Sequence, residues 1–333
     1  DVFVGKEWKK LNYEKVIFPP IPYAPSGLDL ANANFKSPFG PQKVQRKRFW
    51  HLLGTDSLGR DVASGLIHGI RIALLIGFGS MFLSLIIGLP LGLIAGYFGD
   101  NYPVPWWIAA MNFIFGLLFI LYVFVFASIN DASIWMRFVI AFIFIIIIFG
   151  FNRLVHNRVN TSHSSLNISW DLIIMRGIEI FRSIPVLFIF LALLAIIKKP
   201  TAIHIVFIIG CLQWPSIARF VRAEVLGIRN ENYISMAKSV GLSEFRIITK
   251  HILPNAIGPA LIVAAFGFAS AILIESTLSF LGLGLGADQI TWGSMLKNAR
   301  NNFNAWWLAI FPGLAIFISI YIFNKLGDAL NER

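Results

Sequence analysis

The stretch Ile72-Ala-Leu-Leu-Ile-Gly-Phe-Gly-Ser-Met-Phe-Leu-Ser-Leu-Ile-Ile-Gly-Leu-Pro-Leu-Gly-Leu-Ile-Ala-Gly-Tyr-Phe98 contains no charged residue. As a helix rising about 1.5 Å per residue, it is long enough to cross a hydrocarbon layer of about 30 Å. Lipid offers no hydrogen-bond partners, so the backbone of such a segment has to satisfy its own polar groups. We therefore predict a membrane-spanning helix here.

The rest of the chain has the same character. Of its 333 residues, 57% are hydrophobic and 14% are charged, whereas about a quarter of the residues in ordinary globular domains are charged. The unbroken apolar run from Phe138 to Phe151 lacks the alternation of a barrel strand. We predict an all-α, polytopic transmembrane bundle of about seven spans, near residues 72–98, 104–128, 134–151, 178–197, 202–221, 256–281 and 305–323.

Small residues recur inside the first and sixth of these spans and predict close helix packing. They are Gly77, Gly79, Gly88, Gly92 and Gly96 in the first span, and Gly258, Ala264, Ala265, Gly267 and Ala269 in the sixth.

Basic residues near the span ends predict the orientation. The polar stretch 222–255 contains five of them and is placed in the cytoplasm, together with the C-terminus. Residues 1–71 then lie outside, although they contain 11 of the 28 Lys and Arg residues. Segments longer than about 60 residues escape the charge rule. A further span missing before Asp1 would explain how this segment crossed the membrane, and processing to a mature end at Asp1 is the alternative.

The chain shows no zinc-binding spacing, phosphate-cradling glycine loop or nucleophile elbow, and its six histidines are scattered. We predict no catalytic residue, cofactor or metal site, so the chain is not an enzyme. The formal charge of +11 flanks the spans, which favours membrane lipid over nucleic acid as a partner. Cys211 is predicted to be a packing residue.

The most informative polar stretch is Tyr233-Ile-Ser-Met-Ala-Lys-Ser-Val-Gly-Leu-Ser-Glu-Phe-Arg-Ile-Ile-Thr-Lys-His-Ile-Leu-Pro-Asn255. Four residues at i, i+3, i+4 and i+7 predict an apolar stripe on a short helix. They are Tyr233, Met236, Ala237 and Val240. Gly241 can supply the left-handed residue that ends this helix.

A second short helix is predicted after Ser243, its N-cap, with Phe245, Ile248 and Ile252 on one face and a break at Pro254. Two amphipathic helices joined by a sharp bend can present an apolar ridge to the groove of a partner. They can equally lie on lipid head groups, and the pattern alone leaves both readings open.

This stretch resembles the cytoplasmic loop of ATP-binding-cassette (ABC) importer permeases. Its motif reads Glu-Ala-Ala, three residues, Gly, nine residues, Ile-x-Leu-Pro. Ser235, Met236 and Ala237 take the first three places, and Ser235 and Met236 depart from the motif. Gly241 takes the glycine place and His251 the isoleucine place. The resemblance implies ATPase docking through Tyr233, Ser235, Met236, Ala237, Val240, Gly241, Leu253 and Pro254.

Three further stretches are similar to the C-type permease of the oligopeptide, dipeptide and nickel branch, over residues 51–330. They are Gly54-Thr-Asp-Ser-Leu-Gly-Arg-Asp61 with Gly69-Ile-Arg71, Met175-Arg176 with Ser183-Ile-Pro185, and Leu278-Ser-Phe-Leu-Gly-Leu-Gly284 with Trp292-Gly293. In that branch a first span precedes the extracellular segment. The resemblance implies motif residues near the outer face at Gly54, Thr55, Asp56, Gly59, Arg60, Asp61 and Glu275.

The resemblance implies a type I ABC importer permease fold in a bacterial inner membrane. The expected partners are a homologous permease, two ATPase subunits and an extracytoplasmic substrate-binding protein. Peptides are the expected cargo, and nickel or another small solute is the alternative. A secondary transporter needs intramembrane ionisable groups. Glu275 is the only acid well inside a predicted span, and a helix-to-helix hydrogen bond is the role we expect for it.

Four regions follow from these patterns: an extracytoplasmic segment 1–71, a first core span 72–100, an insertion 101–170, and a core 171–330 with the coupling loop 222–255. The insertion carries two spans that the branch usually lacks. Both are apolar almost all round, so we expect this hairpin at the periphery of the bundle. Joining Asp100 to Trp170 should then leave transport largely intact.

Overall fold

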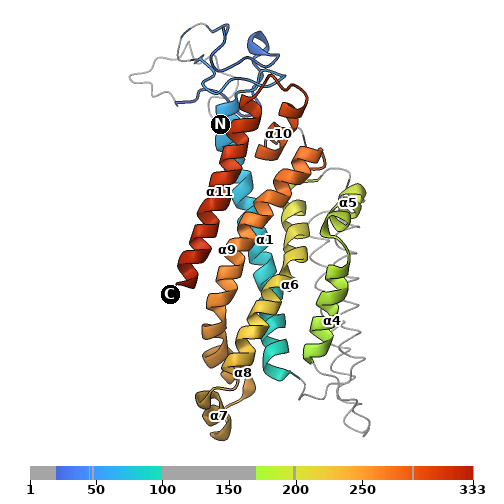
Figure 1. Cartoon of the computed structure of the whole chain (residues 1–333), viewed down its shortest axis with the longest axis vertical. Coiled ribbons are helices and arrows are strands. Elements are labelled where there is room, and N and C mark those ends of the chain that lie inside the picture. Colours follow the sequence, from blue (N-terminus) through green and yellow to red (C-terminus); the bar gives the residue numbers. More distant parts are fainter. Residues whose placement is uncertain are drawn as a thin grey trace, which may run out of the picture.

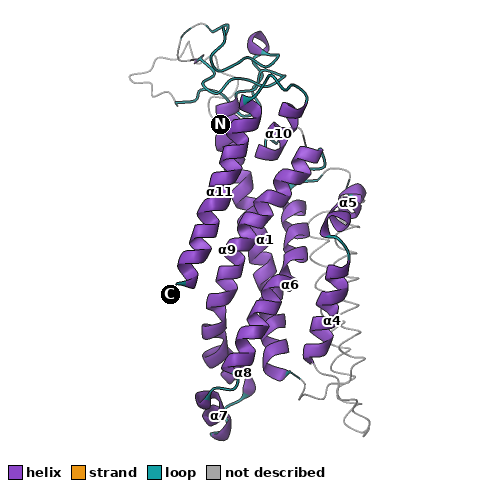
Figure 2. Cartoon of the chain, in the orientation of Figure 1, coloured by secondary structure: helices purple, strands orange, loops and turns teal. Residues whose placement is uncertain are grey.

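A computed structural model describes residues 20–44, 46, 49–99, 170–197, 200–286 and 289–332. This part of the chain is a bundle of long helices lying side by side, and it contains no strand (Figures 1 and 2). Four of its helices are long and apolar enough to cross a membrane, or five if one bent pair counts as a span. The all-helical fold is therefore confirmed. The spans predicted at 104–128 and 134–151, and the hairpin 101–170 that holds them, lie outside the described residues.

Helix α1 (Val62–Phe98) begins before the predicted residue 72 because a polar cap precedes it. The carboxylate of Asp61 accepts a hydrogen bond from the backbone N–H of Ser64 at 2.6 Å, which satisfies one of the free donors of the first turn. The prediction rested on the apolar run alone. It therefore found the membrane part of this helix but not its first turns, which contain polar residues.

Helices α1 and α6 (Ala202–Ile228) run side by side in close contact. A Cβ added at Gly88 would lie 2.7 Å from the carbonyl oxygen of Trp214, and one at Gly92 would lie 2.6 Å from that of Ala218. The two backbones can approach this closely only because glycine has no side chain. The close packing predicted from the small residues of the first span is confirmed.

The span predicted at 178–197 is not one continuous helix and begins earlier, at Trp170. The structure has two helices there, α4 (Trp170–Ser183) and α5 (Val186–Ile196), bent by 74° at the break between them. Pro185 causes the break, because it has no N–H to donate and its ring disfavours helical backbone at Ile184.

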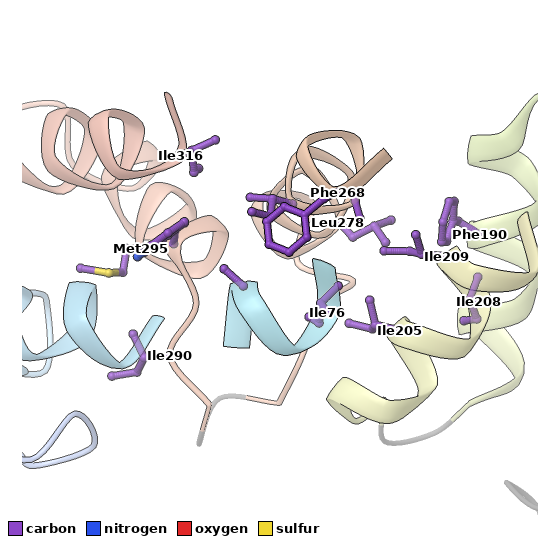
Figure 3. Close-up of a cluster of buried hydrophobic side chains, with 14 of the residues drawn as sticks. Ile76, Phe190, Ile205, Ile208, Ile209, Phe268, Leu278, Ile290, Met295 and Ile316 are labelled. Carbon is purple, nitrogen blue, oxygen red and sulfur yellow. The ribbon is translucent and has the colours of Figure 1, made fainter. Parts of the chain in front are cut away.

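The remaining long helices are α9 (Leu253–Leu281) and α11 (Trp307–Asn331), and the short helix α10 (Trp292–Arg300) lies between them in sequence. Figure 3 shows side chains of different helices meeting in one cluster, among them Ile76 of α1, Ile205 of α6 and Phe268 of α9. All three are buried. This cluster holds α1, α6 and α9 together.

Candidate functional site

Two groups of predicted site residues lie at opposite ends of the bundle. Figure 1 places residues 20–61 and α10 at one end, and α7 (Asn232–Ser239) and α8 (Glu244–Ile247) at the other. We call the first group, residues 20–61, the outer segment. Opposite ends are what the predicted topology requires of an extracytoplasmic segment and a cytoplasmic loop.

Helix α7 ends at a left-handed glycine, as the sequence predicted. Gly241 has φ +81°, which is costly for any residue with a Cβ. Its N–H donates to the carbonyl oxygen of Lys238 at 2.9 Å, and the N–H of Leu242 donates to that of Ala237 at 3.1 Å. This pair of bonds is a Schellman motif, which satisfies the last carbonyls of the helix and turns the chain sharply.

Three of the four residues of the predicted apolar stripe lie on the surface, whereas Ala237 is half-buried against the bundle. Tyr233, Met236 and Val240 are exposed, Val240 at 81%. Ile234 points the other way and is fully buried in a cluster with Ile252. One face of α7 is thus fixed to the bundle, while the opposite face offers apolar side chains to a partner.

The second short helix is not separate, contrary to prediction. Helix α8 continues through a π turn (Ile248–Ile252) directly into α9. Pro254 makes no break, because it stands in the first turn of α9, where a missing N–H is tolerated. Phe245 and Ile252 do not share a face, since Phe245 is 78% exposed and Ile252 is buried. The wider π turn changes the angular spacing on which the predicted face rested.

Ser243 stands at the N-cap position of α8 as predicted, but its side chain makes no capping hydrogen bond.

At the other end, the predicted motif 54–61 forms a tight turn around Asp56. Its Oδ1 accepts from the N–H groups of Leu58 at 2.8 Å and Arg60 at 2.9 Å, and its Oδ2 pairs with Nε of Arg60 at 2.7 Å. Gly59 has φ +81°, and a Cβ there would collide with the carbonyl oxygen of Asp29. The turn therefore requires an acceptor side chain at residue 56 and a glycine three residues later, which is the spacing of the motif.

Indole groups fasten this turn to the helices. Nε1 of Trp307 donates to the carbonyl oxygen of Thr55 at 3.0 Å, and Nε1 of Trp292 donates to that of Leu66, also at 3.0 Å. A Cβ at Gly54 would lie 2.9 Å from Nε1 of Trp307. Trp307 thus holds the turn to α11, whereas Trp292 of the predicted motif 292–293 holds α10 to α1, where its ring also packs against Gly69.

Sequence reasoning missed a buried charge cluster in the outer segment. The ring of His51 is fully buried between two carboxylates, with Nδ1 at 2.8 Å from Asp61 and Nε2 at 3.2 Å from Asp29. A neutral imidazole can donate only one of these bonds, so the geometry suits the doubly protonated ring. The ring of Tyr23 stacks on His51 with centroids 4.1 Å apart.

The pKa values of this cluster shift accordingly. Burial would lower the pKa of His51, but its bonds to Asp61 and Asp29 outweigh burial and raise it. Burial would raise the pKa of Asp29, but hydrogen bonds from Asn32 and His51 outweigh this effect and lower it. Burial beside the two carboxylates raises the pKa of Tyr23 to about 12.

Glu275 lies buried in α9 and is held by hydroxyl groups. Ser279 and Ser276 of the same helix donate to its carboxylate at 2.7 and 3.4 Å. Both partners lie on α9, so the helix-to-helix hydrogen bond expected for Glu275 stays a prediction. A Cβ at Gly293 would collide with the carbonyl oxygen of Ser276, so α10 packs tightly on α9.

Comparisons with known proteins found relatives over most of this chain. A dipeptide transport system permease protein DppC of Alkalihalophilus pseudofirmus is 28% identical over 91% of this chain and 77% of the relative. A di/tripeptide transport system permease protein DppC of Pseudomonas aeruginosa is 31% identical over 84% and 70%. A chain of the MetNI methionine ABC transporter, solved in inward-facing conformations, has a TM-score of 0.42 and 13% identity over 80% of this chain and 96% of that one.

The sequence model of a protein family also matches residues 161–333, which is just over half of the chain. The chain therefore belongs to the family described as binding-protein-dependent transport system inner membrane component.

Proposed function

We propose that this chain is the permease subunit of an ATP-driven peptide importer in a bacterial inner membrane. A homologous permease forms the translocation path with it, two ATPase subunits bind its cytoplasmic end, and an extracytoplasmic binding protein delivers the cargo. Membership of a binding-protein-dependent transport family supports an importer. The names of the relatives, a dipeptide and a di/tripeptide permease, support a peptide as the cargo.

The observation behind the coupling role is an exposed apolar ridge on α7 and α8, formed by Tyr233, Met236, Val240 and Phe245. We call these four residues the coupling ridge. Exposed apolar side chains on short helices at one end of a protein favour docking into the groove of a partner. An ATPase subunit beneath the membrane is the partner that this family provides.

Of the ridge residues, Phe245 is joined to the membrane part by continuous helix, and the three on α7 are joined to it by packing. Helices α8 and α9 follow each other through the π turn, and Ile234 anchors α7 against the same buried cluster. A displacement of the ridge by the ATPase is therefore transmitted along α9 to the opposite end of the bundle. ATP binding and hydrolysis take place on the partner, and this chain converts their motion into opening of the path.

Changing the ridge without disturbing the fold tests this function. Val240→Glu places a charge on a side chain that is 81% exposed, so the permease should fold normally. Truncating a docking hot spot costs about 2 kcal/mol or more, so the ATPase that co-purifies should fall by about tenfold or more. The control is Phe303→Glu, at a 90% exposed residue in the opposite half of the molecule, which should leave co-purification unchanged.

Gly241→Val provides a second pair of variants. The backbone φ of +81° disfavours any β-branched residue, so the bend after α7 should shift and uptake should be lost. Gly227→Val is the matched control, because a Cβ at either glycine meets nothing within 4 Å and Gly227 lies in regular helix. Normal uptake and normal ATPase yield with both Gly241→Val and Val240→Glu would rule out docking through this element.

A further inference from the structure

A cavity of about 940 Å³ opens beside α10, at the end of the bundle that holds the outer segment. The C-terminal parts of α5 and α9, the loops that follow them, and α10 form its walls. The lining combines leucines with polar groups, among them Leu194, Ser279, Gln289, Lys297 and Asn298. A cavity of this volume can hold a small molecule, and its mixed lining can contact both the polar and the apolar groups of a ligand.

A tight turn at the end of α9 shapes one wall. The N–H of Gly282 donates to the carbonyl oxygen of Ser279 at 3.0 Å, and that of Leu283 donates to Leu278 at 2.9 Å. Gly282 has φ +85°, so this turn is a second Schellman motif. A Cβ at Gly284 would collide with Ser279, so the turn folds back onto the helix. The glycines of the predicted motif 278–284 thus build the cavity wall.

The ammonium group of Lys297 lies over this turn. A Cβ at Gly282 would sit 2.9 Å from Nζ of Lys297, so the missing side chain leaves the space that the ammonium occupies. The position also suits a cation, because the C-terminal end of a helix carries partial negative charge. No carboxylate forms an ion pair with Lys297 in the part of the chain that the structure describes.

The cavity as a whole favours an anion. The other cation in its wall, Arg60, is already paired with Asp56, with Nε at 2.7 Å from Oδ2. Among the described residues that line the cavity, Arg60 and Lys297 are the charged ones and none is acidic, and Lys297 is the one of the two with no carboxylate beside it. The amides of Gln289 and Asn298 can bond to peptide groups, and the leucines can contact an apolar side chain.

We propose that this cavity is a binding subsite for the cargo peptide at the outer mouth of the path, with Lys297 binding the C-terminal carboxylate. The inference rests on the proposed function, which makes the cargo a peptide. The anion is the free carboxylate of a peptide, because among the expected ligands only a peptide has an anionic group, amide groups and side chains together.

Protection of a cavity residue from alkylation tests the proposal directly. The assembled transporter carries Cys211→Ser and Ala195→Cys, at a small, exposed residue of the cavity lining, and the alkylation rate by a neutral maleimide is measured with increasing Ala-Phe or its C-terminal amide. The free dipeptide should slow alkylation, and the amide should need about tenfold higher concentration, since a hydrogen bond to a charged group is lost.

Adding Lys297→Met should raise about tenfold the concentration of free dipeptide that is needed to slow alkylation. The concentration of the amide that is needed should stay the same. Lys297→Arg should retain protection. Equal protection by acid and amide, an equal loss for both ligands in Lys297→Met, or protection by an anionic phospholipid in place of the peptide would each overturn the proposal. Peptide uptake without any protection would refute this subsite alone, whereas a transporter that takes up no peptide would refute the proposed function as well.

Discussion

At the scale of single residues, the outer segment is held together by one buried histidine. Asp61 caps α1 through one carboxylate oxygen and bonds His51 through the other, so the ring links the start of the first helix to Asp29. The groups facing the ring are Asp29, Asp61 and the aromatic ring of Tyr23. Loss of the proton on His51 would leave a buried nitrogen lone pair against a carboxylate, which is unfavourable.

This geometry predicts how stability depends on pH. The raised pKa of His51 means that its contribution is complete below its ordinary value of 6.5 and is lost as the pH rises through the folded value. The lowered pKa of Asp29 means that its contribution is present above its ordinary value of 3.8 and is lost as the pH falls through the folded value. Stability should be greatest between these two ordinary values.

Thermal unfolding of the purified chain between pH 5 and pH 9 would show the part of this dependence that comes from His51. His51→Gln should unfold at a lower temperature near pH 6, by an amount that corresponds to about 3–5 kcal/mol for breaking a buried pair. It should also lose the part of the pH dependence above 6.5 that the wild type shows. The control His251→Gln, in the π turn at the opposite end of the bundle, should keep both properties, and an unchanged pH profile in His51→Gln would refute the role of this ring.

At the scale of elements, the contact between α1 and α6 depends on glycines that a side chain would separate. Gly92→Leu should push the two helices apart, because Ala218 already lies where a Cβ would be. Overpacking costs about 1–3 kcal/mol, so the protein should unfold at a lower temperature and yield less assembled transporter. Gly313→Leu in α11 is the matched control, since a Cβ there meets nothing within 4 Å. Equal stability of the two variants would contradict this packing.

The four long helices of the described residues could be predicted from sequence because each contains a long apolar run, and period and length suffice to find such runs. Gly241 could be predicted because only a turn explains a glycine after a short amphipathic stripe. The π turn before α9 could not, since it depends on packing of Ile252 in a cluster that no local pattern reports. The bond between His51 and Asp29 joins residues 22 positions apart in an irregular segment, and no periodicity marks it.

At the scale of the whole molecule, the account requires the outer segment and α7 to lie on opposite sides of the membrane. Ser26 and Ser239 are both exposed, so a cysteine at either should react with a reagent that reaches it. In a Cys211→Ser background, Ser26→Cys should be labelled by an impermeant maleimide on intact cells. Ser239→Cys should be labelled only after permeabilisation, and the reverse pattern would overturn the orientation.

The most direct test of the proposed function is uptake by the complete transporter in proteoliposomes. This chain is reconstituted with its partner permease, ATPases and binding protein, and accumulation of a labelled dipeptide is measured with and without ATP, in parallel with labelled nickel. We predict accumulation of the dipeptide that requires ATP, persists when ion gradients are collapsed, and is absent with Gly241→Val. Accumulation of nickel but not dipeptide, or dipeptide uptake that needs an ion gradient and no ATP, would contradict the account.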